Sequence, residues 1–128
     1  MTKMIKILLA DDHQIVTDGL CSVLEKEADL EVVGIARNGE EVLQQLEAGQ
    51  ADVAVLDIEM PEMDGIEATR HIKERFPEVK VLILSMYNSK DFVQRALEEG
   101  ANVYILKEKS KEALVGAIHT VQSGSRYI

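Results

Sequence analysis

The chain has 128 residues, of which 46% are hydrophobic, and a formal net charge of −9 from 14 Lys and Arg against 23 Asp and Glu. This length and composition exclude a disordered chain and predict one domain, residues 1–128, that folds without a disulfide or a structural metal. The acidic balance repels phosphate backbones and anionic membranes. It therefore disfavours nucleic acid as a direct partner of this chain and favours divalent cations.

The cysteine content and the short apolar runs indicate a reduced compartment. Cys21 is the one cysteine, which excludes an internal disulfide framework, and no apolar run is long enough to cross a bilayer. The first residues lack the cleavage pattern of a signal peptide. We therefore expect a cytoplasmic protein with no membrane partner.

The first half of the chain alternates short apolar runs with amphipathic segments. Runs too short for buried helices predict strands that are covered on both faces, at 5–10, 31–36 and 53–56. Apolar residues at helical spacing predict a first helix from Val16 to about residue 26. The capping-box pair Asn38 and Glu41 predicts the start of a second helix, and Gly49 its end.

The second half repeats this alternation. Two further apolar runs predict strands at 79–84 and 103–106. Three further helices are expected between capping residues and Pro or Gly, namely from Asp64 with Glu67 to Pro77, from Asn88 or Ser89 to Gly100, and from Ser110 to Gly124. The residues of the fourth helix expected to face inward are Phe92, Val93, Ala96 and Leu97.

This order of elements predicts an α/β fold. Apolar strands that alternate with amphipathic helices indicate a five-stranded parallel sheet with helices on both faces. Right-handed crossovers make the topology doubly wound. No internal repeat or linker precedes the last residues, so we place no domain boundary inside the chain.

Polar residues follow the predicted strands at the end where parallel sheets of this kind bind ligands. Asp11 and Asp12 follow the first strand, Asp57 the third, Ser85 the fourth and Lys107 the fifth. Each alone has an ordinary explanation as a helix cap, a turn residue, a satisfied hydroxyl or a surface charge. Their shared position at one edge of the sheet is what predicts a site.

Three carboxylates at one edge repel one another until a proton or a cation relieves them. Mg²⁺ prefers oxygen ligands and is typically held by one or two carboxylates together with phosphate. Asp57 ends the central strand and is the best candidate for a nucleophile that becomes an aspartyl phosphate, with Asp11 and Asp12 as metal ligands. Lys107 and Ser85 can donate hydrogen bonds to the phosphoryl oxygens.

Four segments carry a resemblance to a known family: Leu9-Ala10-Asp11-Asp12-His13, residues 56–65 (LDIEMPEMDG), Leu84-Ser85 and Tyr104-Ile105-Leu106-Lys107. Over essentially the whole chain the sequence resembles the receiver domain of bacterial response regulators. The resemblance implies a flavodoxin-like sheet in the order 2-1-3-4-5 and a switch that catalyses only its own phosphoryl transfer and dephosphorylation. The donor it implies is phosphohistidine on a sensor histidine kinase.

The same resemblance implies a role for each site residue. Asp57 would be the phosphoacceptor and, with Asp11, Asp12 and the backbone carbonyl of Glu59, would bind Mg²⁺. The residues implied to bind the phosphoryl group or to switch are Ser85, Lys107 and Tyr104. Those implied to flank the path of the hydrolytic water, and so to lengthen the lifetime of the phosphoryl group, are Glu59 and Tyr87.

A subtype is indicated by Asp11-Asp12-His13, Gly19-Leu20 and the segment 31–34 (EVVG). These are similar to regulators that end in a LuxR-type helix-turn-helix domain. Residues 124–128 would then begin a linker to a DNA-binding domain, which alone would contact DNA, and phosphorylation would promote a homodimer that regulates transcription. A free-standing receiver that regulates a protein partner is the alternative.

Two positions depart from the family pattern. Glu108 follows Lys107 where the family usually has proline, so a cis peptide bond there would be costly. Asn102 stands where the subtype often has glycine. His13, His71 and His119 form no metal trio by their spacing, and we assign none of them to catalysis.

Three other protein classes fit the sequence less well. A flavin-binding protein of similar topology would not place two acids in its phosphate loop. A phosphatase with an aspartyl-phosphate intermediate calls for two acids separated by a spacer, whereas Asp11 and Asp12 are adjacent. An interaction module that never takes phosphate leaves the full set of acids, hydroxyl and lysine unexplained.

Overall fold

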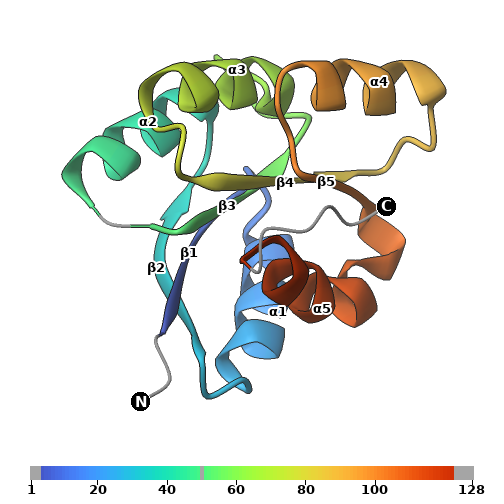
Figure 1. The fold of residues 1–128 in the computed structure, drawn as a ribbon. Coiled ribbons are helices and arrows are strands. Elements are labelled where there is room, and N and C mark those ends of the chain that lie inside the picture. The colour runs from blue at the N-terminus through green and yellow to red at the C-terminus, as the bar shows by residue number, and fades with distance from the viewer. Residues whose placement is uncertain (1–3, 50, 123–128) are drawn as a thin grey trace.

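The computed structural model describes residues 4–49 and 51–122. Five parallel strands form one sheet in the order β2-β1-β3-β4-β5 (Figure 1). The strands are β1 (Ile5–Ala10), β2 (Leu30–Ala36), β3 (Val53–Asp57), β4 (Lys80–Ser85) and β5 (Val103–Leu106). The helices are α1 (Gln14–Glu25), α2 (Gly39–Ala48), α3 (Gly65–Arg75), α4 (Lys90–Glu98), the 3-10 turn η1 (Lys107–Lys109) and α5 (Ser110–Gln122). The predicted doubly wound, flavodoxin-like fold is confirmed.

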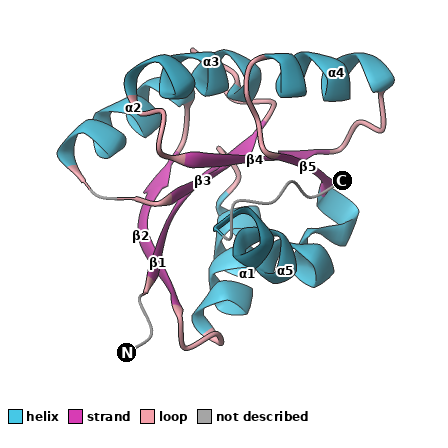
Figure 2. Cartoon of the chain, viewed as in Figure 1, coloured by secondary structure: helices cyan, strands magenta, loops and turns pink. Residues whose placement is uncertain are grey.

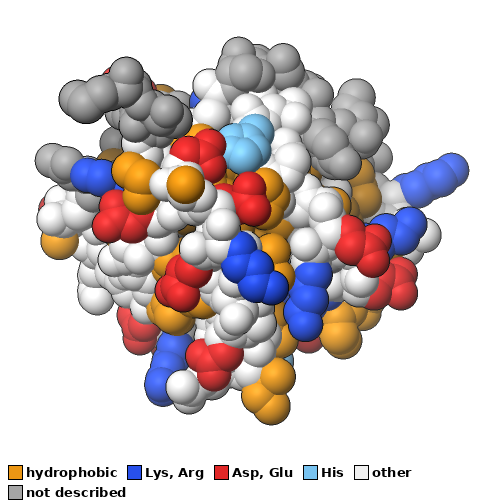
Figure 3. All heavy atoms as spheres, turned by 90° about the horizontal axis from the view of Figure 1, so that it is seen from below, with side chains coloured by type: hydrophobic (Ala, Val, Ile, Leu, Met, Phe, Trp, Pro, Cys, Tyr) orange, Lys and Arg blue, Asp and Glu red, His pale blue; other side chains and the backbone are white. Residues whose placement is uncertain are grey.

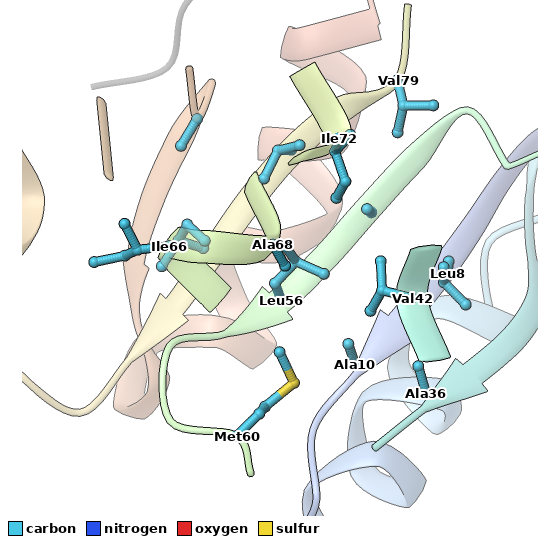
Figure 4. Close-up of a cluster of buried hydrophobic side chains, with 14 of the residues drawn as sticks. Leu8, Ala10, Ala36, Val42, Leu56, Met60, Ile66, Ala68, Ile72 and Val79 are labelled. Atoms are coloured by element: carbon cyan, nitrogen blue, oxygen red, sulfur yellow. The ribbon is translucent and has the colours of Figure 1, made fainter. Parts of the chain in front are cut away.

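Helices cover both faces of the sheet, with α1 and α5 on one side and α2, α3 and α4 on the other (Figure 2). Each face has its own hydrophobic core. Figure 4 shows the second of these faces, where Leu8 of β1 and Leu56 of β3 lie beneath Val42 of α2 and Ile72 of α3. Every residue of β3 is buried, so the central strand is held from both sides.

The outer strand β2 differs from the prediction that both of its faces are covered. Val33 and Ile35 are 45% and 43% exposed, because β2 lies at the edge of the sheet and its register with β1 shifts by one residue after Val32. This bulge turns Gly34 toward α2, where the side chain of Gln45 donates a hydrogen bond to the Ile35 carbonyl oxygen at 2.9 Å. Bulges and side-chain cover of this kind protect a sheet edge from further pairing.

Side-chain caps begin α2, α3 and α4 at predicted residues, namely Asn38, Asp64 and Ser89. Asn38 Oδ1 accepts from the Glu41 backbone N–H at 2.9 Å, and Asp64 Oδ1 accepts from Glu67 N–H at 2.8 Å. The first capping box is nonetheless incomplete, because the Glu41 carboxylate accepts from the Arg37 N–H at 3.0 Å. An N-terminal side-chain cap still satisfies one of the free donors of the first turn.

Helix α4 is the least buried helix. It begins after Ser89 and ends before Gly100, whose φ of +109° confirms the predicted left-handed cap. Ala96 is its one fully buried residue. The prediction that Leu97 faces inward is wrong: the side chain is 37% exposed, because it lies beyond the narrow stripe by which this short helix packs.

The opposite face is covered by α1 and α5. The contact of 2.7 Å between His119 Nε2 and Asp29 Oδ2 ties α5 to the turn before β2. Figure 3 views this side and shows acidic and basic side chains scattered among hydrophobic ones. Within the described ranges, no helix is long and apolar enough to cross a membrane. Gly124 and the expected linker at 124–128 lie outside the described residues.

Candidate functional site

Asp57 lies at the carboxyl end of β3 and is 3% exposed. The start of α3 comes close to this strand end, with Gly65 N–H donating to the Ile58 carbonyl oxygen at 2.9 Å. A Cβ atom on Gly65 would overlap the Asp57 carbonyl oxygen, so only glycine permits this approach. The strand and the glycine together fix the position of the Asp57 carboxylate.

Lys107 follows β5 and brings its ammonium group to two carboxylates. Its Nζ lies 3.0 Å from Asp57 Oδ2 and 3.0 Å from Asp11 Oδ2. Burial alone lowers the pKa of Lys107, but the hydrogen bonds to Asp11 and Asp57 outweigh it, so the net shift is upward. Lys107 therefore stays charged, and it lies in the site as the sequence predicted.

The ionised form of Asp57 is disfavoured even with Lys107 beside it. Burial raises the pKa of its carboxyl group, and the charge of Asp11 adds to the shift, while Lys107 and the Glu59 N–H oppose it. One ammonium group thus compensates two buried carboxylates only in part. A further cation at this position would relieve the remaining repulsion.

The cluster of possible metal ligands is larger than the sequence indicated. Ligand atoms of Asp11, Asp12, His13 and Asp57 all lie within 4.8 Å of one another. His13 is the N-cap of α1, and its Nδ1 lies 3.0 Å from Asp11 Oδ1 and 3.1 Å from Asp12 Oδ1. The sequence analysis assigned no role to His13 and did not predict this contact, although the residue directly follows the acidic pair. The carboxylate oxygens of the cluster suit a hard cation such as Mg²⁺.

Ser85 and Tyr87 approach Asp57 from the end of β4. Ser85 is buried, and its Oγ accepts from the Tyr87 N–H at 2.9 Å. A small hollow of about 40 Å³ is lined by His13, Asp57, Glu59, Ser85, Met86, Tyr87 and Lys107. The neighbouring Glu59 carboxylate raises the pKa of the Tyr87 phenol, and both residues line this hollow.

Tyr104 lies further from the carboxylates and reaches the site through the backbone. Its hydroxyl donates to the Tyr87 carbonyl oxygen at 2.8 Å, and its ring packs partly against the core. The structure therefore brings the predicted residues together around Asp57, with Tyr104 joined to them by Tyr87.

The structure shows the surroundings of Glu108 and Asn102, the two positions that depart from the family pattern. All peptide bonds of the described residues are trans, including Lys107–Glu108, and the chain passes through η1 directly into α5. Asn102 Oδ1 accepts from the Val81 N–H at 3.0 Å and from Lys73 Nζ at 3.2 Å. Asn102 thus fixes the start of β5 against β4, a role that a glycine has no side chain to play.

Residues 7–119 match the model of the response regulator receiver domain family. The chain belongs to this family.

Its curated relatives are longer proteins. It is 40% identical over 124 residues to the transcriptional regulatory protein DegU of Brevibacillus brevis, covering 97% of this chain and 52% of DegU. It is 41% identical over 124 residues to the oxygen regulatory protein NreC of Staphylococcus carnosus (strain TM300), covering 96% and 57%. The chain thus spans about half the length of these relatives.

A solved structure of similar fold is a LuxR-family two-component response regulator from Aurantimonas sp. SI85-9A1. It superimposes with a TM-score of 0.93 at 32% identity, covering 98% of this chain and 90% of that chain. The family and its resemblance to LuxR-type regulators, both predicted from the sequence, are confirmed.

Proposed function

We propose that this receiver domain is a phosphorylation-dependent switch in which Asp57 accepts a phosphoryl group from phosphohistidine on a sensor histidine kinase. The observation that carries the proposal is the contact of Lys107 Nζ with the two buried carboxylates of Asp57 and Asp11, each at 3.0 Å, beside the exposed Asp12. The fold itself does not require three acids at this edge of the sheet. The cluster has a chemical use, because it holds a nucleophile beside a cation site and a fixed ammonium group.

The residues that would hold Mg²⁺ are Asp11, Asp12, Asp57 and the Glu59 backbone carbonyl. When bound, the ion neutralises negative charge on the acids and on the incoming phosphoryl group. An Asp57 carboxylate oxygen forms the new bond to phosphorus, the bond from phosphorus to the donor nitrogen breaks, and its electron pair leaves on the imidazole. Lys107 and the Ser85 hydroxyl then donate hydrogen bonds to the phosphoryl oxygens.

Glu59 and Tyr87 would set how long the phosphoryl group persists. Both residues line the hollow beside Asp57, where hydrolytic water must enter in line with the phosphorus–oxygen bond. A ring and a carboxylate in that path hinder the attack. We therefore expect phospho-Asp57 to last for many minutes or longer.

The switch would act through Ser85, Tyr87 and Tyr104. A phosphoryl group adds roughly −1.5 to −2 charge and three acceptor oxygens, which draw the Ser85 hydroxyl toward Asp57. The Tyr87 N–H now donates to Ser85 Oγ, and the Tyr87 carbonyl accepts from Tyr104, so both bonds respond to that movement. Tyr104, already half-buried, can turn further inward, and the face formed by α4 and α5 changes shape.

In a longer cytoplasmic protein this change would promote a homodimer and align a DNA-binding domain joined through residues 124–128. The lengths of DegU and NreC support such an arrangement, since the chain covers 52% and 57% of them. Sedimentation of the phosphorylated and unmodified domain, each beside Ser85→Ala, tests the dimer. A monomer in every sample would favour the free-standing receiver that acts on a protein partner.

The phosphorylation itself is tested by intact-mass measurement after incubation with Mg²⁺ and acetyl phosphate. We expect the mass gain of one phosphoryl group, no gain with EDTA, and no gain in Asp57→Asn. Asp12→Ala should require more Mg²⁺ for the same gain, whereas Lys107→Ala should still bind the metal but fail to shift the face formed by α4 and α5. A phosphoryl group retained on Asp57→Asn would refute the assignment.

A further inference from the structure

Tyr87 lies beside four different parts of the chain. Its N–H donates to Ser85 Oγ at 2.9 Å, and its carbonyl oxygen accepts from the Tyr104 hydroxyl at 2.8 Å. The neighbouring Glu59 carboxylate raises the pKa of its phenol, and both residues line the small hollow. Its ring stacks on Phe92, with ring centroids 5.3 Å apart and an angle of 30° between the planes. The first three contacts belong to the site already described, but Phe92 belongs to α4.

Phe92 joins the ring of Tyr87 to the first turn of α4. The Phe92 N–H donates to the N-cap Ser89 at 3.5 Å, and the Arg95 guanidinium carbon lies 5.8 Å from the Phe92 ring centroid. Offset aromatic pairs and cation–π contacts each add stabilisation beyond the area they bury. Ala96 is the one fully buried residue of α4. The contacts of Phe92 with Tyr87 and Arg95 are therefore a substantial part of what holds the first turn of α4 in place.

The two stacked rings line two adjoining hollows. Tyr87 lines the small hollow of about 40 Å³ over Asp57, which has room for roughly one or two water molecules. Phe92 lines a wider hollow of about 580 Å³ that is open to solvent, and Glu59 and His13 line both hollows. Tyr87 is therefore the residue of the small hollow whose ring is supported by α4.

We infer that Phe92 is a positioning residue that holds Tyr87 across the mouth of the phosphorylation site, so that the position of α4 sets the rate at which water reaches phospho-Asp57. The inference rests on the proposed phosphorylation of Asp57. Phe92 acts only through Tyr87 and contacts no reacting atom. A shift of α4 therefore changes the lifetime of the phosphoryl group as well as the surface of the domain.

The test is the first-order loss of phosphoryl mass after acetyl phosphate is removed, in wild type, Phe92→Ala, Tyr87→Ala and the double variant. Phe92→Ala should speed the loss roughly 2- to 10-fold, the rate equivalent of an aromatic contact. In the Tyr87→Ala background the same change should have no further effect. Phe92→Tyr keeps a ring at this position and should restore the wild-type rate, and Leu97→Ala, on an exposed part of α4, should match wild type.

Each result separates this inference from the proposed function. If wild type gains a phosphoryl group but Phe92→Ala decays at the wild-type rate, the inference is overturned and the proposed function stands. If Phe92→Ala speeds decay by the same factor with and without Tyr87, the residue acts by loosening the fold and the inference is again overturned. If wild type gains no phosphoryl group, both are overturned.

Discussion

Strand β3 and helix α4 contribute to the same site but are held in the molecule very differently. All five residues of β3 are buried, and the strand pairs with β1 on one side and β4 on the other. In α4 one residue, Ala96, is fully buried, and Leu97 is 37% exposed. Met86, which precedes the helix, is 71% exposed. Asp57, the proposed nucleophile, lies on β3, whereas α4 supports Tyr87 at the edge of the site.

This difference matches the two tasks of a switch. A nucleophile and its lysine must keep their geometry within a fraction of an ångström, which a central strand packed on both faces provides. A surface that reports the phosphorylation state must move at low cost, and elements with few buried contacts are the ones that open or shift most easily. The exposed apolar side chains near α4 are also the ones that a protein partner would cover.

The largest effect is expected at the junction of β3 and α3. Gly65→Ala should destabilise the domain by about 4 kcal/mol or more, because the added methyl group meets backbone atoms of Asp57 that cannot move aside. Gly116→Ala is the matched control, since nothing lies within 4 Å of its added Cβ and alanine favours a helix by about 1 kcal/mol. Urea unfolding measures both, and equal stability of the two variants would contradict the rigid junction.

The contrast between anchored and loosely held helices predicts the next effect. Ile72→Ala in α3 should cost about 3 kcal/mol, because the side chain is fully buried in the core beneath α2 and α3. Leu97→Ala in α4 should change stability by less than about 0.5 kcal/mol. Comparable losses at the two sites would show that α4 is packed as firmly as α3.

A smaller, pH-dependent effect is expected from Asp57→Asn in EDTA. Burial raises the pKa of Asp57 in the folded state, so its ionised form destabilises the fold at pH values above that pKa. The variant should therefore unfold at higher urea than wild type near pH 7, and the difference should shrink as the pH falls through the raised pKa. It should vanish below about 3.9, the ordinary value of an unfolded Asp. A less stable variant at pH 7 would mean that the contact with Lys107 outweighs burial.

The smallest effect concerns the loop between β3 and α3. Glu62 has a φ of +69°, and the Met63 N–H donates to the Pro61 carbonyl oxygen at 2.7 Å around it, which is the strained form of a three-residue turn. Glu62→Gly should stabilise the domain by about 0.5 kcal/mol, since glycine relieves the strain but loses more entropy on folding. Glu112→Gly, in α5, should instead cost about 1 kcal/mol, and a loss in both variants would argue against strain at residue 62.

The sequence predicted the buried strands better than the exposed elements. Apolar runs locate buried strands, and the strand ends locate Asp57, Ser85 and Lys107, because parallel strands share one carboxyl edge. The outward position of Leu97 was not predicted, because helical spacing alone does not say how wide a packed stripe is. The bulge after Val32 also escaped, since it depends on pairing with β1.

Side-chain contacts that involve loop residues were the least predictable part of the site. His13 bridges Asp11 and Asp12, and Phe92 stacks on Tyr87, through side-chain rotamers and loop paths that no periodic pattern encodes. The nearness of Tyr87 to Glu59 was expected only from the family resemblance. Asn102 became interpretable once its bonds to Val81 and Lys73 were visible.

The most direct test of the account is hydrogen exchange of the domain with Mg²⁺ and acetyl phosphate, compared with Asp57→Asn under the same conditions. We predict changed exchange rates for the backbone amides of residues 86–98, which include α4, with the rates in β3 unchanged. The variant should show neither change. Fully phosphorylated protein with unaltered exchange in α4, or the same alteration in Asp57→Asn, would contradict the claim that a rigid phosphorylation site drives this loosely held helix.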